Sequence, residues 1–237
     1  MTTATNNISF KEKQLRFERV YAAYTEKETI IHGLFKAKKI DLKNLRIFLR
    51  ILKKEQKLEL WAKNKNAATF QLIKIYDFCD VSGTLGPKRE QGDNQTPEGL
   101  YHIERFNPAS TYYLSLGINY PNKADRILSG ERNPGGDIFI HGKCVTIGCI
   151  PITDFWIKEL YIIAVEACNS GQKDIPVYIF PSKLDDAHFK SLVTDSKPSK
   201  SNLKLWKELK QAYDYFETNH TTASFSIDAK GSYVIEY

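Results

Sequence analysis

Between residues 81 and 137 the chain is interrupted by turn-forming sequences so often that no long helix fits there. The stretches SGTLGP, QGDNQTPEG, FNPAS, GINYPN and NPGGD combine glycine and proline with asparagine, aspartate and serine, which favour tight turns. Short candidate strands lie between or after them, at residues 100–105, 112–116 and 137–141. Several short strands separated by turns predict an antiparallel sandwich or a partly closed barrel.

Before this region the spacing of apolar residues changes from helical to strand-like. Two sets recur at the intervals of one helical face: Phe17, Val20, Tyr21 and Tyr24, and then Leu45, Phe48, Leu49 and Leu52. Residues 1–55 are therefore expected to form a helical N-terminal region. From residue 57 apolar and polar residues alternate, and 70–78 is rich in strand-favouring types, so a hairpin turning at 64–66 is predicted.

The last third of the chain predicts two helices, a buried strand and a hairpin. Thr153 and Asp154 are N-cap candidates for a helix with one apolar stripe along residues 157–168. Residues 175–180 indicate a buried strand, a second helix carries Trp206 and Tyr213, and the tail indicates a hairpin turning at 228–231. The expected fold is α+β, with a helical region 1–55, a mostly β domain 56–182, and a helix-plus-hairpin extension 183–237.

Composition excludes several classes of protein. The 237 residues are 42% hydrophobic and 26% charged, which fits a folded chain with a sizeable core. The sequence contains no run of about 18 apolar residues, so no transmembrane helix is predicted. The first residues, MTTATNNISFKEKQ, lack the pattern of a secretory signal. The net charge of +6 comes without a nucleic-acid-binding motif, so no nucleic-acid partner is expected.

The segment FIHGKCVTIGCIPITD, residues 139–154, carries the chemistry. His141 ends a predicted strand, and Cys149 follows it by eight residues, just before the predicted helix. A thiol nucleophile needs a base, which His141 can supply, and a helix start favours the negative thiolate. Gly148 allows close backbone approach, so N–H groups near Gly148 and Cys149 can form an oxyanion hole, and Thr146 can hold the loop by a hydrogen bond.

Two other interpretations of this segment stay open. A histidine and a cysteine this close are often structural, because free cysteine is commonly a buried small apolar residue. A zinc site built on His141, Cys144 and Cys149 would have unusual spacing and lacks an evident fourth ligand. We expect no metal and no cofactor. Cys79, Cys144 and Cys168 are expected to be buried thiols, with pairing of Cys144 to Cys149 as an alternative.

Three motifs, which follow one another in the family's order along the chain, resemble the L,D-transpeptidase catalytic domain family (YkuD-like), and within it the YafK-like branch. FIHGKCVTIGCIPITD is similar to the active-site signature of the family. GTLGPKREQGDNQTPEGLYHI is similar to its glycine-rich turn leading into T-P-x-G-x-Y-x-I, and YYLSLGINYPNKADR resembles the same branch. The resemblance covers residues 58–181 and implies a mostly β catalytic domain.

The resemblance implies a role for each residue of the signature. Cys149 would be the nucleophile and His141 its general base, with Gly142 orienting the histidine through its backbone. Thr146 and Gly148 match the family's Ser/Thr and glycine positions. Two positions depart from the common form: a second histidine is replaced by Ile147, and an arginine by Pro151. Recognition of substrate carboxylates must therefore use other residues.

The substrate implied is the peptidoglycan stem peptide, attacked at the diamino-acid in position three to give a thioester on Cys149. Water would resolve it in an L,D-carboxypeptidase or in an amidase that releases an anchored protein, and an amine in an L,D-transpeptidase. The implied partners are stem peptides, with a peptidoglycan-anchored protein as a further candidate, and the implied location is the periplasm or cell envelope. Alternatives are an inactive peptidoglycan-binding module, against which the presence of both Cys149 and His141 argues, and an unrelated cysteine peptidase.

Residues around the expected groove are candidates for substrate binding. These are Tyr112, Tyr120, Asn122 and Arg126. Binding residues often lie in loops such as the one that holds Tyr120 and Asn122, whereas packing of Tyr112 in a strand and of Tyr120 as a loop anchor is the alternative. Lys88 and Arg89 can meet stem-peptide carboxylates or can simply be solvated.

Overall fold

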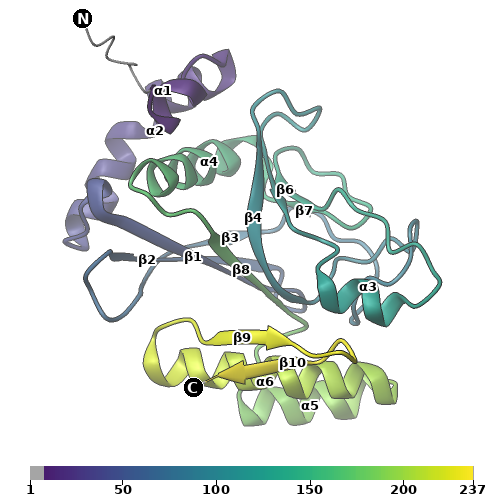
Figure 1. Ribbon diagram of the computed structural model, residues 1–237. Helices are drawn as coiled ribbons and strands as arrows, with labels where there is room; N and C mark the ends of the chain where they lie inside the picture. Colours follow the sequence, from purple (N-terminus) through teal and green to yellow (C-terminus); the bar gives the residue numbers. More distant parts are fainter. Residues whose placement is uncertain (1–7, 237) are drawn as a thin grey trace, which may run out of the picture.

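A computed structural model describes residues 8–236 of the chain. Its centre is one eight-stranded sheet that curls, so that β4 crosses the direction of β1 and β2 steeply (Figure 1). The strands in spatial order are β3 (Gln71–Asp77), β2 (Lys57–Asn64), β1 (Leu45–Leu52), β8 (Ile175–Phe180), β4 (Gly99–Asn107), β5 (Ser115–Ile118), β6 (Phe139–His141) and β7 (Ile150–Pro151). The α+β class is confirmed. Most neighbouring strands are antiparallel, while β1 with β8 and β6 with β7 are parallel.

The expectation of a helix at residues 45–52 is wrong, because this segment is β1 at the centre of the sheet. Its alternate residues enter two different cores: Ile47, Leu49 and Ile51 face one cluster, and Phe48 and Leu52 face the other. A strand buried on both faces is apolar almost throughout, so its residues also match helical spacing. The sheet therefore begins at Leu45.

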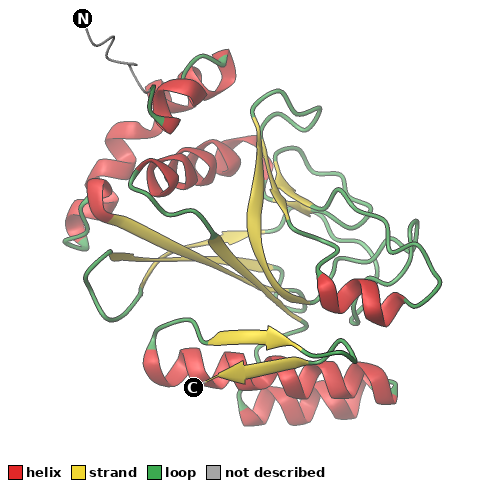
Figure 2. Cartoon of the chain, in the orientation of Figure 1, coloured by secondary structure: helices red, strands yellow, loops and turns green. Residues whose placement is uncertain are grey.

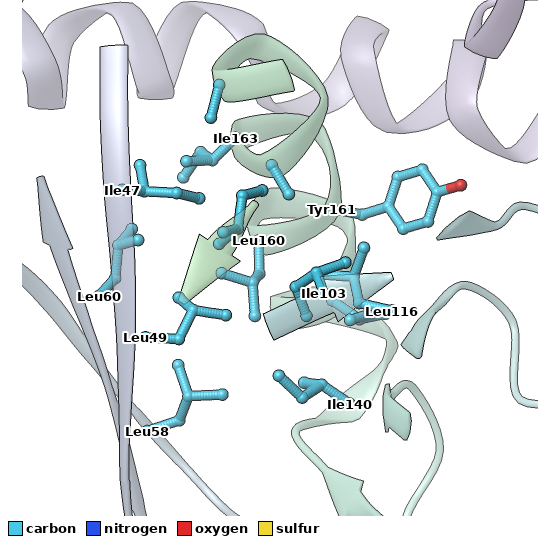
Figure 3. Close-up of a cluster of buried hydrophobic side chains, with 14 of the residues drawn as sticks. Ile47, Leu49, Leu58, Leu60, Ile103, Leu116, Ile140, Leu160, Tyr161 and Ile163 are labelled. Atoms are coloured by element: carbon cyan, nitrogen blue, oxygen red, sulfur yellow. The ribbon is translucent and has the colours of Figure 1, made fainter. Parts of the chain in front are cut away.

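One face of the sheet is covered by α4 (Thr153–Asn169), which confirms the predicted helix. Leu160 and Ile163 of α4 point toward Leu49 and Leu60 of the sheet (Figure 3). Outside α4 lie the short α1 (Phe10–Gln14) and the long α2 (Glu18–Ala37). Val20 and Tyr24 of the predicted apolar face of α2 are buried, but Tyr21 is 63% exposed.

The opposite face is covered by the C-terminal elements, which form a separate layer of helices and a hairpin (Figure 2). α6 (Lys200–Asn219) and the antiparallel pair β9 (Ser224–Ile227) and β10 (Tyr233–Glu236) confirm the predicted helix and hairpin. α5 (Asp186–Ser196) was not expected from the sequence. Two short elements complete the chain, the 3-10 turn η1 (Leu42–Asn44) and α3 (Lys123–Ser129). No helix within residues 8–236 has the length and apolar character needed to cross a membrane.

Candidate active site

Cys149 and His141 are brought together by the parallel pairing of β6 with β7. In this register Ile140 lies beside Ile150 and His141 beside Pro151, so Cys149 stands next to Phe139 at the start of the pair. The Phe139 N–H donates to Cys149 Sγ at 3.4 Å. Phe139 and His141 are two residues apart on one strand, so their side chains share a face. The sulfur thus lies beside β6 at the level of Phe139, two residues along the strand from His141.

The Cys149 thiol is protonated in the resting protein. Sγ donates to the Asp137 carbonyl at 3.5 Å, and no hydrogen bond joins it to His141 among the residues the structure describes. Burial raises the pKa of the Cys149 thiol, while the Phe139 N–H and the charge of Lys88 act in the opposite direction. The thiol is therefore neutral, and it could act as a nucleophile only if another group took its proton.

His141 is held as a neutral base. It is 1% exposed, and its Nδ1 hydrogen bonds to the carbonyl oxygen of Gly142, the residue that follows it. A carbonyl oxygen can only accept, so Nδ1 carries the proton and Nε2 is left with its lone pair. Burial lowers the pKa of His141, although the Gly142 bond opposes this. The imidazole is consequently uncharged at neutral pH and able to take a proton.

Thr146 organises the loop that carries the thiol. Its Oγ1 donates to the carbonyl of Cys149 at 2.8 Å and accepts the N–H of Gly148 at 3.1 Å. Gly148 has a φ of +132°, and a Cβ there would lie 2.8 Å from the carbonyl oxygen of Gln95. Only glycine fits this position without displacing backbone. Because Thr146 occupies the Gly148 N–H, that group is not free to bind a substrate oxygen as the sequence suggested.

The start of α4 fastens the same loop. Asp154 Oδ1 accepts the N–H of Lys143 at 2.8 Å, which ties the loop to the helix. Thr153 Oγ1 accepts the N–H of Trp156 at 3.4 Å, three residues on, as a capping side chain does. Neither candidate is the N-cap, which is Ile152 and offers no side-chain bond; Thr153 bonds within the first turn of α4, and Asp154 holds the loop.

A disulfide links Cys79 with Cys144, which corrects the expectation that both are buried thiols. It joins the segment after β3 to the loop that contains Cys149, and it removes Cys144 from the alternative zinc ligand set. The free cysteines are Cys149 and Cys168 within residues 8–236. Burial raises the pKa of Cys168 to about 11, so this thiol is unreactive at neutral pH.

Cys149 reaches a cavity of about 220 Å³. The cavity lies between the turn after β1, the segment after β3, and the loop of Cys149. Its wall is formed by Lys53, Lys54, Gln56, Phe78, Asp80, Val81, Ser82, Gly83, Thr84, Leu85, Thr96 and Cys149. Two backbone bonds hold these parts together: Phe78 N–H donates to the Gln56 carbonyl at 2.9 Å, and Cys79 N–H to that of Pro151 at 3.0 Å. The thiol thus opens into a partly enclosed space whose wall is largely apolar and also carries charged and hydroxyl side chains.

Of the four residues expected to bind substrate, Tyr112 alone contacts His141, by stacking on its ring. Tyr120 is buried, and its hydroxyl donates to the carbonyl of Pro134 at 3.0 Å. Asn122 caps α3 by accepting the Asp125 N–H at 3.1 Å. Asn122 and Arg126 line a different cavity, of about 800 Å³, beside β4 and β9. The structure therefore does not bring Tyr120, Asn122 or Arg126 to the wall of the Cys149 cavity.

Lys88 and Arg89 are not solvated loop residues. Lys88 Nζ lies 2.6 Å from Asp93 Oδ1 in a buried ion pair, and Arg89 pairs with the buried Asp125 at 2.8 Å. Both cations are consequently committed within the protein. His102 of β4 is also outside the cavity of Cys149: its side chain is 38% exposed, and its Nε2 lies 4.0 Å from Oδ1 of the exposed Asp174.

Several residues in the cavity wall, and one directly behind it, were missed by sequence reasoning. Lys53 and Glu98 form a buried ion pair of 2.9 Å, and Glu98 Oε2 also accepts from Trp206 Nε1 at 2.7 Å. Glu98 belongs to the TPEG motif, so its burial had a local signal. Lys54, Asp80 and Ser82 had no such local signal. Lys54 reaches the same cavity as Asp80 and Ser82 only because strands distant in sequence are paired.

The comparisons with known proteins agree on one family. Residues 46–179, more than half of the chain, match the L,D-transpeptidase catalytic domain (YkuD). The "Putative L,D-transpeptidase YafK" of Escherichia coli K12 is 36% identical over 192 residues, covering 80% of this chain and 73% of that protein, and the protein of the same name from strain O157:H7 matches equally.

Solved structures were also compared. The helical cell shape determining protein Pgp2 from Campylobacter jejuni has a TM-score of 0.46 and 16% identity, covering 78% of this chain and 73% of that one. L,D-transpeptidase 1 of Mycobacterium tuberculosis has a TM-score of 0.32 and 12% identity, covering 57% of this chain and 62% of that one. On the strength of the sequence matches, the chain belongs to the L,D-transpeptidase catalytic domain family.

Proposed function

We propose that this chain is a cysteine-dependent enzyme that modifies peptidoglycan stem peptides through a thioester on Cys149, with His141 as general base. Family membership supports the substrate class. The observation that carries the mechanism is the bond from His141 Nδ1 to the Gly142 carbonyl, which leaves Nε2 ready to accept a proton on the strand beside Cys149. The cavity at Cys149 supplies the space for a peptide.

The first half-reaction forms the thioester. When a stem peptide enters the cavity, Sγ leaves the Asp137 carbonyl and its proton passes to His141 Nε2. The sulfur attacks the carbonyl carbon of the diamino-acid in position three. The carbon–nitrogen bond to the next residue breaks, and the leaving amine takes the proton back from the imidazolium. His141 returns to its neutral form, and the acyl group remains on Cys149.

The oxygen that becomes negative during attack needs N–H donors. We assign the Cys149 N–H to this task, because the Gly148 N–H is bonded to Thr146 and the Cys149 N–H makes no hydrogen bond within the described residues. The Thr146 bond to the Cys149 carbonyl fixes the orientation of this peptide unit. Thr146 and Gly148 are thus positioning residues of the loop.

The second half-reaction transfers the acyl group. We propose water as the acceptor: His141 takes its proton as the water oxygen attacks the thioester carbonyl, the carbon–sulfur bond breaks, and the imidazolium returns the proton to Cys149 Sγ. This makes the enzyme an L,D-carboxypeptidase or an amidase that releases a peptidoglycan-anchored protein. An amine acceptor on a second stem makes it an L,D-transpeptidase. The proposed location is the periplasm or cell envelope, and the Cys79–Cys144 disulfide supports it because disulfides persist in oxidising compartments.

The test is product analysis by mass spectrometry. Wild-type protein, Cys149→Ala and the control Cys168→Ala are incubated with three substrates: tetrapeptide muropeptides, the same with a second stem as amine donor, and tripeptide stems carrying an anchored protein fragment. Loss of one D-alanine means a carboxypeptidase, a new 3–3 cross-link a transpeptidase, and release of the fragment an amidase. Each must vanish in Cys149→Ala and persist in Cys168→Ala.

The alternative is an inactive peptidoglycan-binding module. It predicts binding of muropeptides without conversion of any of the three substrates. Such a result, with Cys149 shown to be reduced, would contradict the proposed enzyme.

A further inference from the structure

The cavity of Cys149 carries one lysine whose charge is not used by the protein. Lys53 is committed, since its Nζ bonds to three backbone carbonyls and to Glu98 at 2.8 to 3.2 Å. Lys54 is different. Its side chain is 46% exposed, and its partner is the exposed Asp195 at 3.8 Å, a pair that solvent screens strongly. Lys54 therefore offers an available ammonium group to a ligand in the cavity.

The same wall carries a carboxylate without a cationic partner. Asp80 Oδ1 accepts the N–H of the next residue, Val81, at 2.8 Å. Asp80 forms no ion pair within residues 8–236, although it lines the cavity together with Lys54. The two charges are not within ion-pair distance of each other, so each can be satisfied by a ligand group between them.

A third group is left unsatisfied. Ser82 Oγ is buried and has no hydrogen-bond partner among the described residues, and Ser82 lines the same cavity. A buried hydroxyl without a partner is unfavourable, and a polar ligand atom would remove that cost. The cavity thus presents an ammonium and a carboxylate on the wall that also holds the Cys149 thiol, and the unpaired Ser82 hydroxyl lies just beneath the surface of that wall.

We propose that Lys54, Asp80 and Ser82 bind the zwitterionic end of the side chain of a diamino dicarboxylic acid in position three of the stem peptide. Lys54 pairs with its carboxylate, Asp80 with its ammonium group, and Ser82 hydrogen bonds to either. This inference rests on the proposed function. It accounts for carboxylate recognition in a chain that has Pro151 where its family often has arginine, and in which Lys88 and Arg89 are already paired.

The test compares two tetrapeptide muropeptides that differ in one functional group. One has a free carboxylate at the far end of the diamino-acid, and in the other this carboxylate is amidated. Lys54→Met removes the charge and keeps an unbranched side chain, and Lys190→Met on the exposed surface of α5 is the matched control. Values of kcat/KM are measured for both substrates with each protein.

Wild-type protein and Lys190→Met should prefer the free carboxylate, and Lys54→Met should lose about tenfold or more on that substrate alone, as expected for a lost charge-assisted hydrogen bond. Asp80→Asn should lower kcat/KM for substrates with a free far-end amine and leave N-acetylated ones unchanged. Equal losses on both substrates, or no loss, would overturn the assignment while leaving Cys149-dependent turnover, and with it the proposed function, intact.

If wild-type protein converts neither substrate, calorimetric binding to the Cys149→Ala protein decides the question instead. The subsite is supported, even though the proposed reaction has failed, if the free-carboxylate muropeptide binds more tightly than the amidated one. This preference should be lost in the double variant Cys149→Ala, Lys54→Met. Equal affinity for the two muropeptides overturns it.

Discussion

The imidazole of His141 packs against the phenol ring of Tyr112, with 4.6 Å between the ring centroids and 33° between the ring planes. Tyr112 is 39% exposed and His141 is 1% exposed, so the tyrosine shields the base from water on this side. The Tyr112 carbonyl also accepts the N–H of Gly142 at 3.1 Å. Tyr112 therefore covers the imidazole and holds the residue that orients it.

Truncating Tyr112 should change the pH dependence of the reaction. Burial lowers the pKa of His141, so removing the covering ring in Tyr112→Ala raises that pKa toward its ordinary value. More of the base is then protonated near neutral pH, and the acid limb of the kcat/KM profile should move to higher pH. Tyr112→Phe keeps the stacked ring and should retain the wild-type profile. Identical acid limbs in all three proteins would contradict the shielding role.

Gly148 should be intolerant of a side chain. Gly148→Ala places a Cβ against the Gln95 carbonyl at a φ of +132°, which costs about 1–3 kcal/mol or displaces the thiol loop. We expect a folded protein with turnover reduced at least tenfold, since the loop sets the position of Cys149. Gly136→Ala is the control, because nothing lies within 4 Å of a Cβ there. Circular dichroism and kcat/KM of both variants measure this, and equal activities would refute it.

Removing the disulfide should destabilise the protein. The bond between Cys79 and Cys144 closes a loop with a sequence separation of 65, and loss of such a bond costs about 2–5 kcal/mol of unfolding free energy. Urea denaturation of the Cys79→Ser, Cys144→Ser double variant should show this loss. Cys168→Ser, which removes a thiol outside the bond, should lose clearly less. A midpoint for the double variant equal to that of wild type would show that the bond adds no stability.

The buried pair of Lys53 and Glu98 should be far more sensitive than a surface pair. Glu98→Ala leaves Lys53 buried without its counter-charge, and breaking such a pair costs about 3–5 kcal/mol. Asp77→Ala breaks the exposed pair with Lys57 and should cost less than about 1 kcal/mol. Chemical denaturation measures both free energies of unfolding. Comparable costs for the two variants would mean that burial does not make the Lys53–Glu98 pair more important to stability than a surface pair.

Local periodicity and turn-forming residues predicted several elements of the fold correctly. The α4 helix, the hairpin of β2 and β3 and the C-terminal hairpin all agree with the sequence. β1 was taken for a helix because both of its faces are buried, so that no polar alternation marks it as a strand. For the loop of Tyr120 the sequence allowed either substrate binding or anchoring, and the inward hydrogen bonds of Tyr120 and Asn122 favour anchoring.

The candidate site also contains some contacts that the local sequence predicts and others that it does not. His141, Gly142, Thr146 and Cys149 lie within nine consecutive residues, so their proximity could be inferred from the sequence. The pairing of Cys79 with Cys144 spans 65 residues and depends on the course of the segment after β3. The course of the segment after β3 also brings Asp80 to the cavity that Lys54 lines. Contacts set by strand pairing over long separations leave no local mark.

In the proposed reaction Cys149 carries the acyl group of the stem peptide. Intact-protein mass spectrometry, after rapid acid quenching of wild-type protein with a tetrapeptide muropeptide, should show the added mass of the acyl portion, and peptide mapping should place it on Cys149. The adduct should be absent in Cys149→Ala and should not form on Cys168, whose pKa is about 11. Turnover that persists in Cys149→Ala, or an adduct on any other residue, would contradict the account.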